Sequence, residues 1–210
     1  FQSNLEAYLG VKHVIPCANG TDALQVAMMG LGLQPGDEVI TADFTFAATV
    51  EVIALLGLTP VLVDVDPVSF NISPQAIEKA ITLKTKAIVP VHLFGQVADM
   101  DAIMAIAKKH NLYVIEDNAQ GIGATHTDTE GNKIKTGGIG HVGSTSFFPS
   151  KNLGCYGDGG LISVKNKKKY EFLLKLRTHG GTTRNQHDVI GYNSRLGEIQ
   201  AAILDTKLKY

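Results

Sequence analysis

Few features of this 210-residue chain are typical of secreted or membrane-spanning proteins. It contains two cysteines, Cys17 and Cys155, and no signal-like beginning, which argues against a disulfide framework and predicts a reducing, cytoplasmic location. Its longest nearly apolar stretch, residues 53–63, is broken by a glycine, a threonine and a proline, whereas a helix needs about 20 apolar residues to cross a bilayer. We therefore expect a soluble protein.

The chain also lacks an excess of charge of either sign. Nineteen Lys and Arg side chains stand against twenty Asp and Glu side chains, which gives a formal net charge of −1. Such a chain has no general electrostatic attraction for nucleic acid or for an anionic membrane surface, so neither is an expected partner. Its apolar content of 44% is enough for a sizeable core.

Three common site motifs are missing. The seven histidines include no His-Glu-x-x-His spacing, so no metal site is predicted. There is no P-loop, and Gly121-Ile122-Gly123 does not begin a dinucleotide-binding fingerprint because His126 stands where the third glycine is required. A doubly wound, nucleotide-binding oxidoreductase therefore stays only as an alternative.

Short β-branched runs alternate with amphipathic stretches along most of the chain. The runs predict strands at residues 13–17, 38–42, 61–65, 87–92, 113–116, 144–148 and 160–164. The stretches between them predict helices at residues 21–33, 46–56, 74–81 and 100–110, the third of them capped by Ser73 and begun by Pro74. Because parallel strands need a crossover that is normally a helix, this order predicts an α/β fold, a three-layer α/β/α arrangement around a mostly parallel central sheet.

Both ends of the chain read as helices. An apolar stripe at helical spacing begins at Phe1 and ends at Gly10, where a left-handed cap is expected. A second stripe runs from Leu196 to Leu204 without a glycine or proline terminator before Tyr210. We therefore expect a fragment, or an ordered portion of a longer protein, that lacks a C-terminal part.

Ligands of open α/β sheets bind beyond the carboxyl ends of the strands, which directs attention to the residues that follow each strand. After the first strand, Gly20, Thr21 and Asp22 lie in a small-residue turn that enters a helix. Exposed amides, the helix dipole and a hydroxyl make such a turn a natural phosphate site. The alternative is an ordinary turn in which Thr21 or Asp22 caps the helix.

Two further strand ends carry charged side chains. Asp117 follows an apolar strand, where a poorly hydrated carboxylate needs a cation or hydrogen-bond donors; a simple turn aspartate is the alternative. Lys151 lies among aromatic, proline and glycine residues, a sheltered setting that favours the neutral amine a nucleophile requires; a surface lysine is the alternative. An anion site, a counter-ion for a ring nitrogen and a Schiff-base amine are together what pyridoxal phosphate requires.

Five motifs follow one another along essentially the whole chain: Asn19-Gly20-Thr21-Asp22-Ala23-Leu24, Pro90-Val91-His92-Leu93-Phe94-Gly95-Gln96 with Asp99-Met100-Asp101, Glu116-Asp117-Asn118-Ala119-Gln120, Ser146-Phe147-Phe148-Pro149-Ser150-Lys151-Asn152-Leu153-Gly154, and Tyr192-Asn193-Ser194-Arg195-Leu196 with Gln200-Ala201-Ala202. In these motifs the sequence resembles the DegT/DnrJ/EryC1/StrS family of nucleotide-sugar aminotransferases, which are fold-type I enzymes dependent on pyridoxal 5'-phosphate. The resemblance implies the large domain of that fold and the same cofactor.

The resemblance also implies a role for individual residues around the cofactor ring. Lys151 is expected to form the Schiff base, Asp117 to pair with the ring nitrogen and Gln120 to lie near the phenolic oxygen. Phe46 matches the aromatic residue that stacks on the ring. Because some family members carry histidine in place of the Schiff-base lysine and act as dehydratases, Lys151 favours transamination.

Other matching residues surround the cofactor phosphate in the family. Thr21 and Ser146 match its phosphate-binding hydroxyls, and Gly20 and Asp22 are expected to contribute backbone groups. Asn193 matches an asparagine that the neighbouring subunit supplies, which implies a homodimer with shared active sites.

The resemblance further implies transfer of an amino group, with glutamate as the expected donor, to a keto-sugar nucleotide, in surface-polysaccharide or amino-sugar biosynthesis. The segment around Lys151 is most similar to members that aminate C3 of a keto-hexose, often a UDP-linked sugar. Expected substrate contacts are His92 and His179, with Arg177 and Arg184 as further candidates; a structural role is the alternative for each. A catalytically silent or truncated cofactor-binding member is a second reading of the chain.

Two departures from the family pattern concern the C-terminal region. Residues 1–190 are expected to form the cofactor-binding large domain, and residues 191–210 only the start of the C-terminal small domain. Gly197 stands where the family usually has an acidic residue, and a glycine inside a helix costs about 1 kcal/mol relative to alanine. The glycine therefore predicts a weakened helix start.

Overall fold

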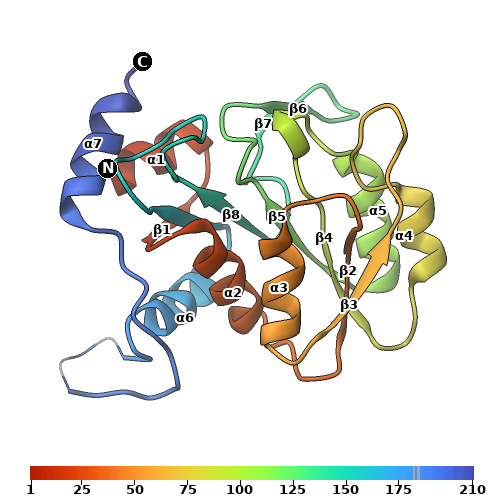
Figure 1. Ribbon diagram of the computed structural model, residues 1–210, viewed down its shortest axis with the longest axis horizontal. Helices are drawn as coiled ribbons and strands as arrows, with labels where there is room; N and C mark the ends of the chain where they lie inside the picture. The colour runs from red at the N-terminus through yellow and green to blue at the C-terminus, as the bar shows by residue number, and fades with distance from the viewer. Residues whose placement is uncertain (182, 184) are drawn as a thin grey trace.

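A computed structural model describes residues 1–181, 183 and 185–210 of the chain. Within these residues one large sheet has the strand order β1-β9-β8-β5-β4-β2-β3 (Figure 1). The strands are β1 (His13–Cys17), β2 (Glu38–Ala42), β3 (Thr59–Val63), β4 (Thr85–Val89), β5 (Tyr113–Asp117), β8 (Val142–Ser146) and β9 (Gly160–Val164). Only β9 runs antiparallel to its neighbours β1 and β8, so the carboxyl ends of the other strands meet at one edge.

Helices cover both faces of the sheet (Figure 1). One apolar core joins the sheet to α2 (Gly20–Gly30), α3 (Ala47–Leu55) and α6 (Lys167–Arg177). The opposite face packs against α4 (Pro74–Ala80) and α5 (Met100–His110). The alternation of side chains along a strand explains this division, since Val39 belongs to the first core and its neighbour Ile40 to the second. The three-layer α/β/α prediction is confirmed.

A third apolar cluster lies at the β1 end of the sheet. It joins α1 (Gln2–Leu9) to α7 (Glu198–Lys207), through Leu5 and Leu204 among others. Gly10 ends α1 in the left-handed conformation, with φ of 67°, as the sequence predicts. None of the helices in the described part of the chain combines the length and the apolar surface that a membrane crossing requires.

The glycine at the start of α7 is less costly than the sequence predicts. Gly197 is the N-cap, with φ −69° and ψ 144°, and not an interior helical residue. Glycine at an N-cap costs only a few tenths of a kcal/mol relative to the best capping residues. The predicted weakening of this helix start is therefore wrong.

Predicted element bounds differ from the structure at several strands. The strand predicted at 61–65 occupies Thr59–Val63, which includes Pro60. A proline lacks the N–H of a ladder hydrogen bond, but β3 is an edge strand paired only with β2, where a proline is tolerated. The sequence reading also missed η1 (Leu93–Gly95) and a short hairpin of β6 (Thr125–Thr127) and β7 (Lys133–Lys135), since neither carries a strong apolar period.

Candidate active site

A cavity of about 550 Å³ opens at the carboxyl ends of the central strands. Its walls come from the turn after β1, the start of α3, the residues at and after the end of β5, and the end of β8 with the turn that follows. All of the cofactor-binding residues predicted from the sequence line it, except Asn193: Gly20, Thr21, Asp22, Phe46, Asp117, Gln120, Ser146 and Lys151. The fold thus brings together segments that lie far apart in the sequence.

The N-terminus of α2 forms one wall of the cavity. Asn19 is its N-cap, and the Asn19 side chain accepts a hydrogen bond of 2.8 Å from the amide of Asp22. The cap is therefore neither Thr21 nor Asp22, the two capping residues considered in the sequence. A Cβ atom on Gly20 would lie 2.7 Å from Cβ of Ser146, so only glycine lets the helix start approach the end of β8 this closely. The start of α2 and the Ser146 hydroxyl thereby lie close together, as an anion site requires. The Asp22 amide, which was expected to contribute to this site, is bonded to the Asn19 cap.

Asp117 ends β5 with only 4% of its surface exposed. Its backbone is paired with the segment after β4, since its N–H donates to Pro90 O at 2.9 Å and its carbonyl accepts from the amide of His92 at 3.0 Å. Its carboxylate accepts one hydrogen bond on each oxygen, from Thr49 Oγ1 to Oδ2 at 2.6 Å and from the amide of Ala119 to Oδ1 at 3.1 Å. The carboxylate is therefore fixed in place at the cavity wall.

Lys151 lies in a tight turn after β8. Its amide donates to Phe148 O at 2.8 Å, and a Cβ atom on Gly154 would lie 2.4 Å from Pro149 O, so the turn closes only with glycine there. Lys151 Nζ is 6.0 Å from the centre of the Phe46 ring. Phe46 is 68% exposed although it is a large aromatic residue, which leaves a flat surface on the cavity wall beside the amine.

Gln120 lines the cavity, and its side-chain oxygen is already bonded within the protein. Its Oε1 accepts a hydrogen bond of 2.6 Å from the amide of Phe94, a residue with a positive φ of 56° in η1. The NH₂ group of the Gln120 side chain is therefore the part that can donate to a ligand oxygen.

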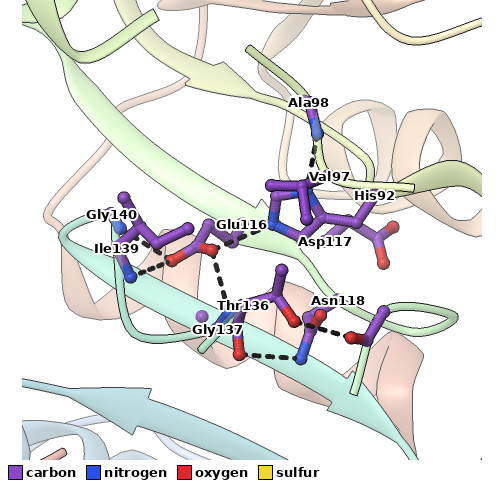
Figure 2. A network of polar contacts seen from close by, with 12 residues as sticks. His92, Val97, Ala98, Glu116, Asp117, Asn118, Thr136, Gly137, Ile139 and Gly140 are labelled. Carbon is purple, nitrogen blue, oxygen red and sulfur yellow. Dashed lines mark hydrogen bonds and ion pairs between the residues drawn. The ribbon is translucent and has the colours of Figure 1, made fainter. Parts of the chain in front are cut away.

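A fully buried polar network lies beside these residues, on the neighbouring position of β5 (Figure 2). The Glu116 carboxylate accepts from the amides of Gly137, Ile139 and Gly140 at 2.8, 2.7 and 2.7 Å, and it is 2.9 Å from Nε2 of His92. Nδ1 of His92 accepts from the Ala98 amide at 3.2 Å, as Figure 2 shows, which assigns the proton to Nε2.

This network shows that His92 does not line the cavity. The ring is completely buried and both of its nitrogens have partners, which is the structural role given above as the alternative to a substrate contact. Sequence reasoning missed Glu116 itself. A carboxylate inside an apolar strand is a signal, but its partners are backbone amides that no motif identifies.

A sequence profile described as the DegT/DnrJ/EryC1/StrS aminotransferase family matches residues 1–210. The chain belongs to this family. Among its relatives, a protein named "Pleiotropic regulatory protein" from Geobacillus stearothermophilus is 52% identical over 209 residues, 100% of this chain and 55% of the relative. The UDP-2-acetamido-2-deoxy-3-oxo-D-glucuronate aminotransferase of Pseudomonas aeruginosa is 50% identical over 208 residues, 99% of this chain and 56% of the relative.

Solved structures of the family share the fold of this chain. A DegT DnrJ EryC1 StrS aminotransferase from Brucella abortus has a TM-score of 0.93 and 47% identity, over 99% of this chain and 57% of that one. NtdA from Bacillus subtilis, solved with bound cofactor PMP, has a TM-score of 0.91 and 38% identity, over 98% of this chain and 46% of that one. The chain therefore spans about half the length of the relatives it matches.

Asn193 and the candidate substrate residues His179 and Arg177 lie outside the cavity. Asn193 is exposed, and its Oδ1 accepts from Nε of Arg195 at 3.0 Å. His179 is exposed with a positive φ of 55°, whereas Arg177 Nη1 donates to Pro16 O at 2.8 Å and so ties α6 to β1. Arg184 lies outside the described residues.

Tyr192 is a further contact that the sequence reading did not single out. Its hydroxyl donates to Oδ1 of Asp22 at 3.4 Å, and burial, with the nearby Asp22 charge, raises the pKa of Tyr192 to about 12. The phenol therefore stays protonated at neutral pH. It links the segment before α7 to the first turn of α2.

Proposed function

We propose that the protein is a pyridoxal phosphate-dependent aminotransferase that moves an amino group from glutamate to the keto carbon of a sugar nucleotide. The observation that carries the proposal is one cavity that combines a helix N-terminus, a buried carboxylate and the Lys151 amine. The aminotransferase activity of the 50%-identical relative and the PMP found in NtdA support the same conclusion.

The residues of the cavity fit the cofactor in shape and charge. The start of α2 and the Ser146 hydroxyl lie close together in the cavity, as a phosphate site requires. The exposed ring of Phe46 offers a stacking surface, and the buried carboxyl group of Asp117 offers an acceptor for a ring N–H. Pyridoxal phosphate, when bound, supplies a ring that accepts carbanion charge from the carbon of the amino donor.

In the proposal two side chains, those of Lys151 and Asp117, take part in covalent attachment and proton transfer. Lys151 would hold the cofactor covalently through its Nζ, and the same amine, once freed by the amino donor, would act as the acid and base that moves a proton from the donor carbon to the cofactor carbon. Asp117 would keep a proton on the ring nitrogen. An opposed charge pair at 4 Å is worth about 4 kcal/mol at an effective dielectric constant of 20, before desolvation is subtracted, which is why a carboxylate suits this position better than an amide.

For the acceptor we propose a UDP-linked 3-keto-hexose, used in surface-polysaccharide or amino-sugar biosynthesis. The name of the Pseudomonas aeruginosa relative describes such a 3-oxo sugar nucleotide. A nucleotide diphosphate supplies binding energy away from the reacting carbon, and this energy orients the keto group over the cofactor. We therefore expect a free keto-sugar to be a far worse substrate. His179 stays a candidate substrate contact, and His92 could act only through its neighbours.

We also propose a homodimer with shared active sites. Asn193 is exposed outside the cavity of its own chain, as expected of a residue that serves the phosphate of a neighbouring subunit. In this proposal residues 1–190 form the cofactor-binding domain, and residues 191–210 begin the small domain. Both cysteines are buried and unpaired, which supports a cytoplasmic location.

The second candidate function is regulation without catalysis, because the relative that is 52% identical is named a regulatory protein. The two functions are separated by the spectrum of the purified full-length protein. An aminotransferase is expected to bind pyridoxal phosphate with a visible absorbance that glutamate removes and that a UDP-3-keto-sugar then restores. A protein that binds the cofactor but does not respond to glutamate would be a silent member. Turnover of 2-keto acids alone would overturn the sugar assignment.

A further inference from the structure

Thr49 makes a polar contact at the candidate active site that the family motifs do not account for. It is the third residue of α3 and is completely buried. Its hydroxyl donates to Oδ2 of Asp117 at 2.6 Å, across 68 positions of sequence. A short hydrogen bond to a carboxylate is among the stronger hydrogen bonds in proteins.

This contact is not the usual one for a threonine in a helix. A helical threonine hydroxyl commonly bonds to the carbonyl three or four residues earlier, as Thr206 in α7 does with Ala202 O at 3.0 Å. Thr49 instead directs its hydroxyl out of its own helix. The contact therefore belongs to Asp117 and not to the local stability of α3.

The two oxygens of the Asp117 carboxylate are held from separate elements. Thr49 holds Oδ2 from α3, and the Ala119 amide holds Oδ1 from the turn after β5. With the amide alone, the carboxylate could rotate about its terminal bond; with both donors its plane is set. Each oxygen keeps a lone pair for a further donor.

The same helical turn also carries part of the cavity wall. Phe46 is the N-cap of α3, and both Phe46 and Ala48 line the cavity. The Thr49 amide bonds back to Phe46 O at 3.3 Å. One turn of helix therefore connects the aromatic surface to the orientation of the carboxylate.

We propose that Thr49 is a positioning residue: its hydroxyl orients the Asp117 carboxylate toward the ring nitrogen of the bound cofactor. This inference rests on the proposed function. Loss of the hydroxyl is expected to affect steps that depend on the protonated ring. It should not affect substrate binding, because Thr49 does not line the cavity.

The test compares three variants of the full-length protein reconstituted with pyridoxal phosphate. Thr49→Val removes the hydroxyl at nearly constant volume, Thr49→Ser keeps it, and Thr41→Val is the matched control. Thr41 is also completely buried, but its hydroxyl donates to a backbone carbonyl, Val89 O at 2.9 Å, away from the cavity. A loss of stability caused by removing a buried hydroxyl should therefore appear in both valine variants, whereas an effect on the cofactor should appear only in Thr49→Val.

We expect Thr49→Val to lower kcat about 10-fold to 100-fold, the range for loss of a hydrogen bond to a charged group, with the KM for glutamate within about twofold of wild type. It should also alter the pH dependence of the cofactor's visible absorbance and speed loss of the cofactor on dialysis. Thr49→Ser should restore all three properties, and Thr41→Val should leave them unchanged. If Thr49→Val does not fold, Thr49→Ala against Thr49→Ser gives the same comparison.

A double-mutant comparison separates this inference from the proposed function. If Thr49 acts through Asp117, then adding Thr49→Val to Asp117→Asn should cause little further loss. Two results would overturn the role of Thr49 alone. One is a double variant whose loss of kcat equals the combined losses of the two single variants. The other is a Thr49→Val protein with the wild-type kcat and absorbance profile when Asp117→Asn is impaired. A wild-type profile in Asp117→Asn, or no cofactor binding by the wild-type protein, would overturn the proposed cofactor chemistry and the inference with it.

Discussion

Glu116→Gln tests whether the buried network holds the central strands together. The four donors around Glu116 divide evenly, because Oε1 accepts from Ile139 and Gly140 and Oε2 accepts from Gly137 and His92. Glutamine has the same size, but its NH₂ group must replace one of the two oxygens. Whichever side it takes, two buried donors then face another donor.

The tautomer of His92 cannot relieve this conflict. In the other tautomer Nδ1 carries the proton. The N–H at Nδ1 would then face the N–H of Ala98, and the hydrogen bond between Ala98 and Nδ1 would be lost. Two lost hydrogen bonds to a charged group, at about 1.5 to 3 kcal/mol each, predict a destabilisation of about 3 to 6 kcal/mol. A typical domain has only about 5 to 15 kcal/mol of stability.

The assay is urea denaturation of Glu116→Gln, followed by circular dichroism, with Glu171→Gln as the control. Glu171 is an exposed residue of α6, and its substitution should change the free energy of unfolding by no more than about 0.5 kcal/mol. A loss below about 1 kcal/mol in Glu116→Gln would refute the reasoning. It would mean that the segment after Thr136 finds other acceptors at little cost.

Three other predictions concern the proposed chemistry. Lys151→Ala should fold normally but lose the cofactor linkage that borohydride reduces, so a remaining reducible linkage would contradict the role of the lysine. Asp117→Asn should keep the coloured cofactor but transfer protons much more slowly, which stopped-flow absorbance after glutamate addition measures; near wild-type rates would show that the ring nitrogen is paired elsewhere. An equal mixture of Lys151→Ala and Asn193→Asp chains should recover about one quarter of wild-type activity. About half of the dimers in the mixture are hybrids, and each hybrid has one intact site of two. Mixed dimers without activity would exclude a shared site.

The architecture of the protein is readable from local sequence. Strands β1, β2 and β9 and helix α5 have the predicted bounds, because burial imposes a period of two on strands and 3.6 on helices. The rule that ligands bind beyond strand ends also located Gly20, Asp117 and Lys151 in one cavity. The bounds of some elements, such as β3, could not be predicted in this way. β3 can include Pro60 because it lies at the edge of the sheet, and that position depends on the order of the strands.

The sequence by itself thus determined the α/β layers, the family motifs and a part of the residues around the cavity. The tertiary structure alone decided that Asn19 caps α2, that His92 is buried against Glu116, and that Thr49 orients Asp117. Each of these is a contact in which a side chain meets a backbone group or a residue from a different element. Periodicity records which face of an element is buried, but it does not record which donor meets which acceptor once the layers pack.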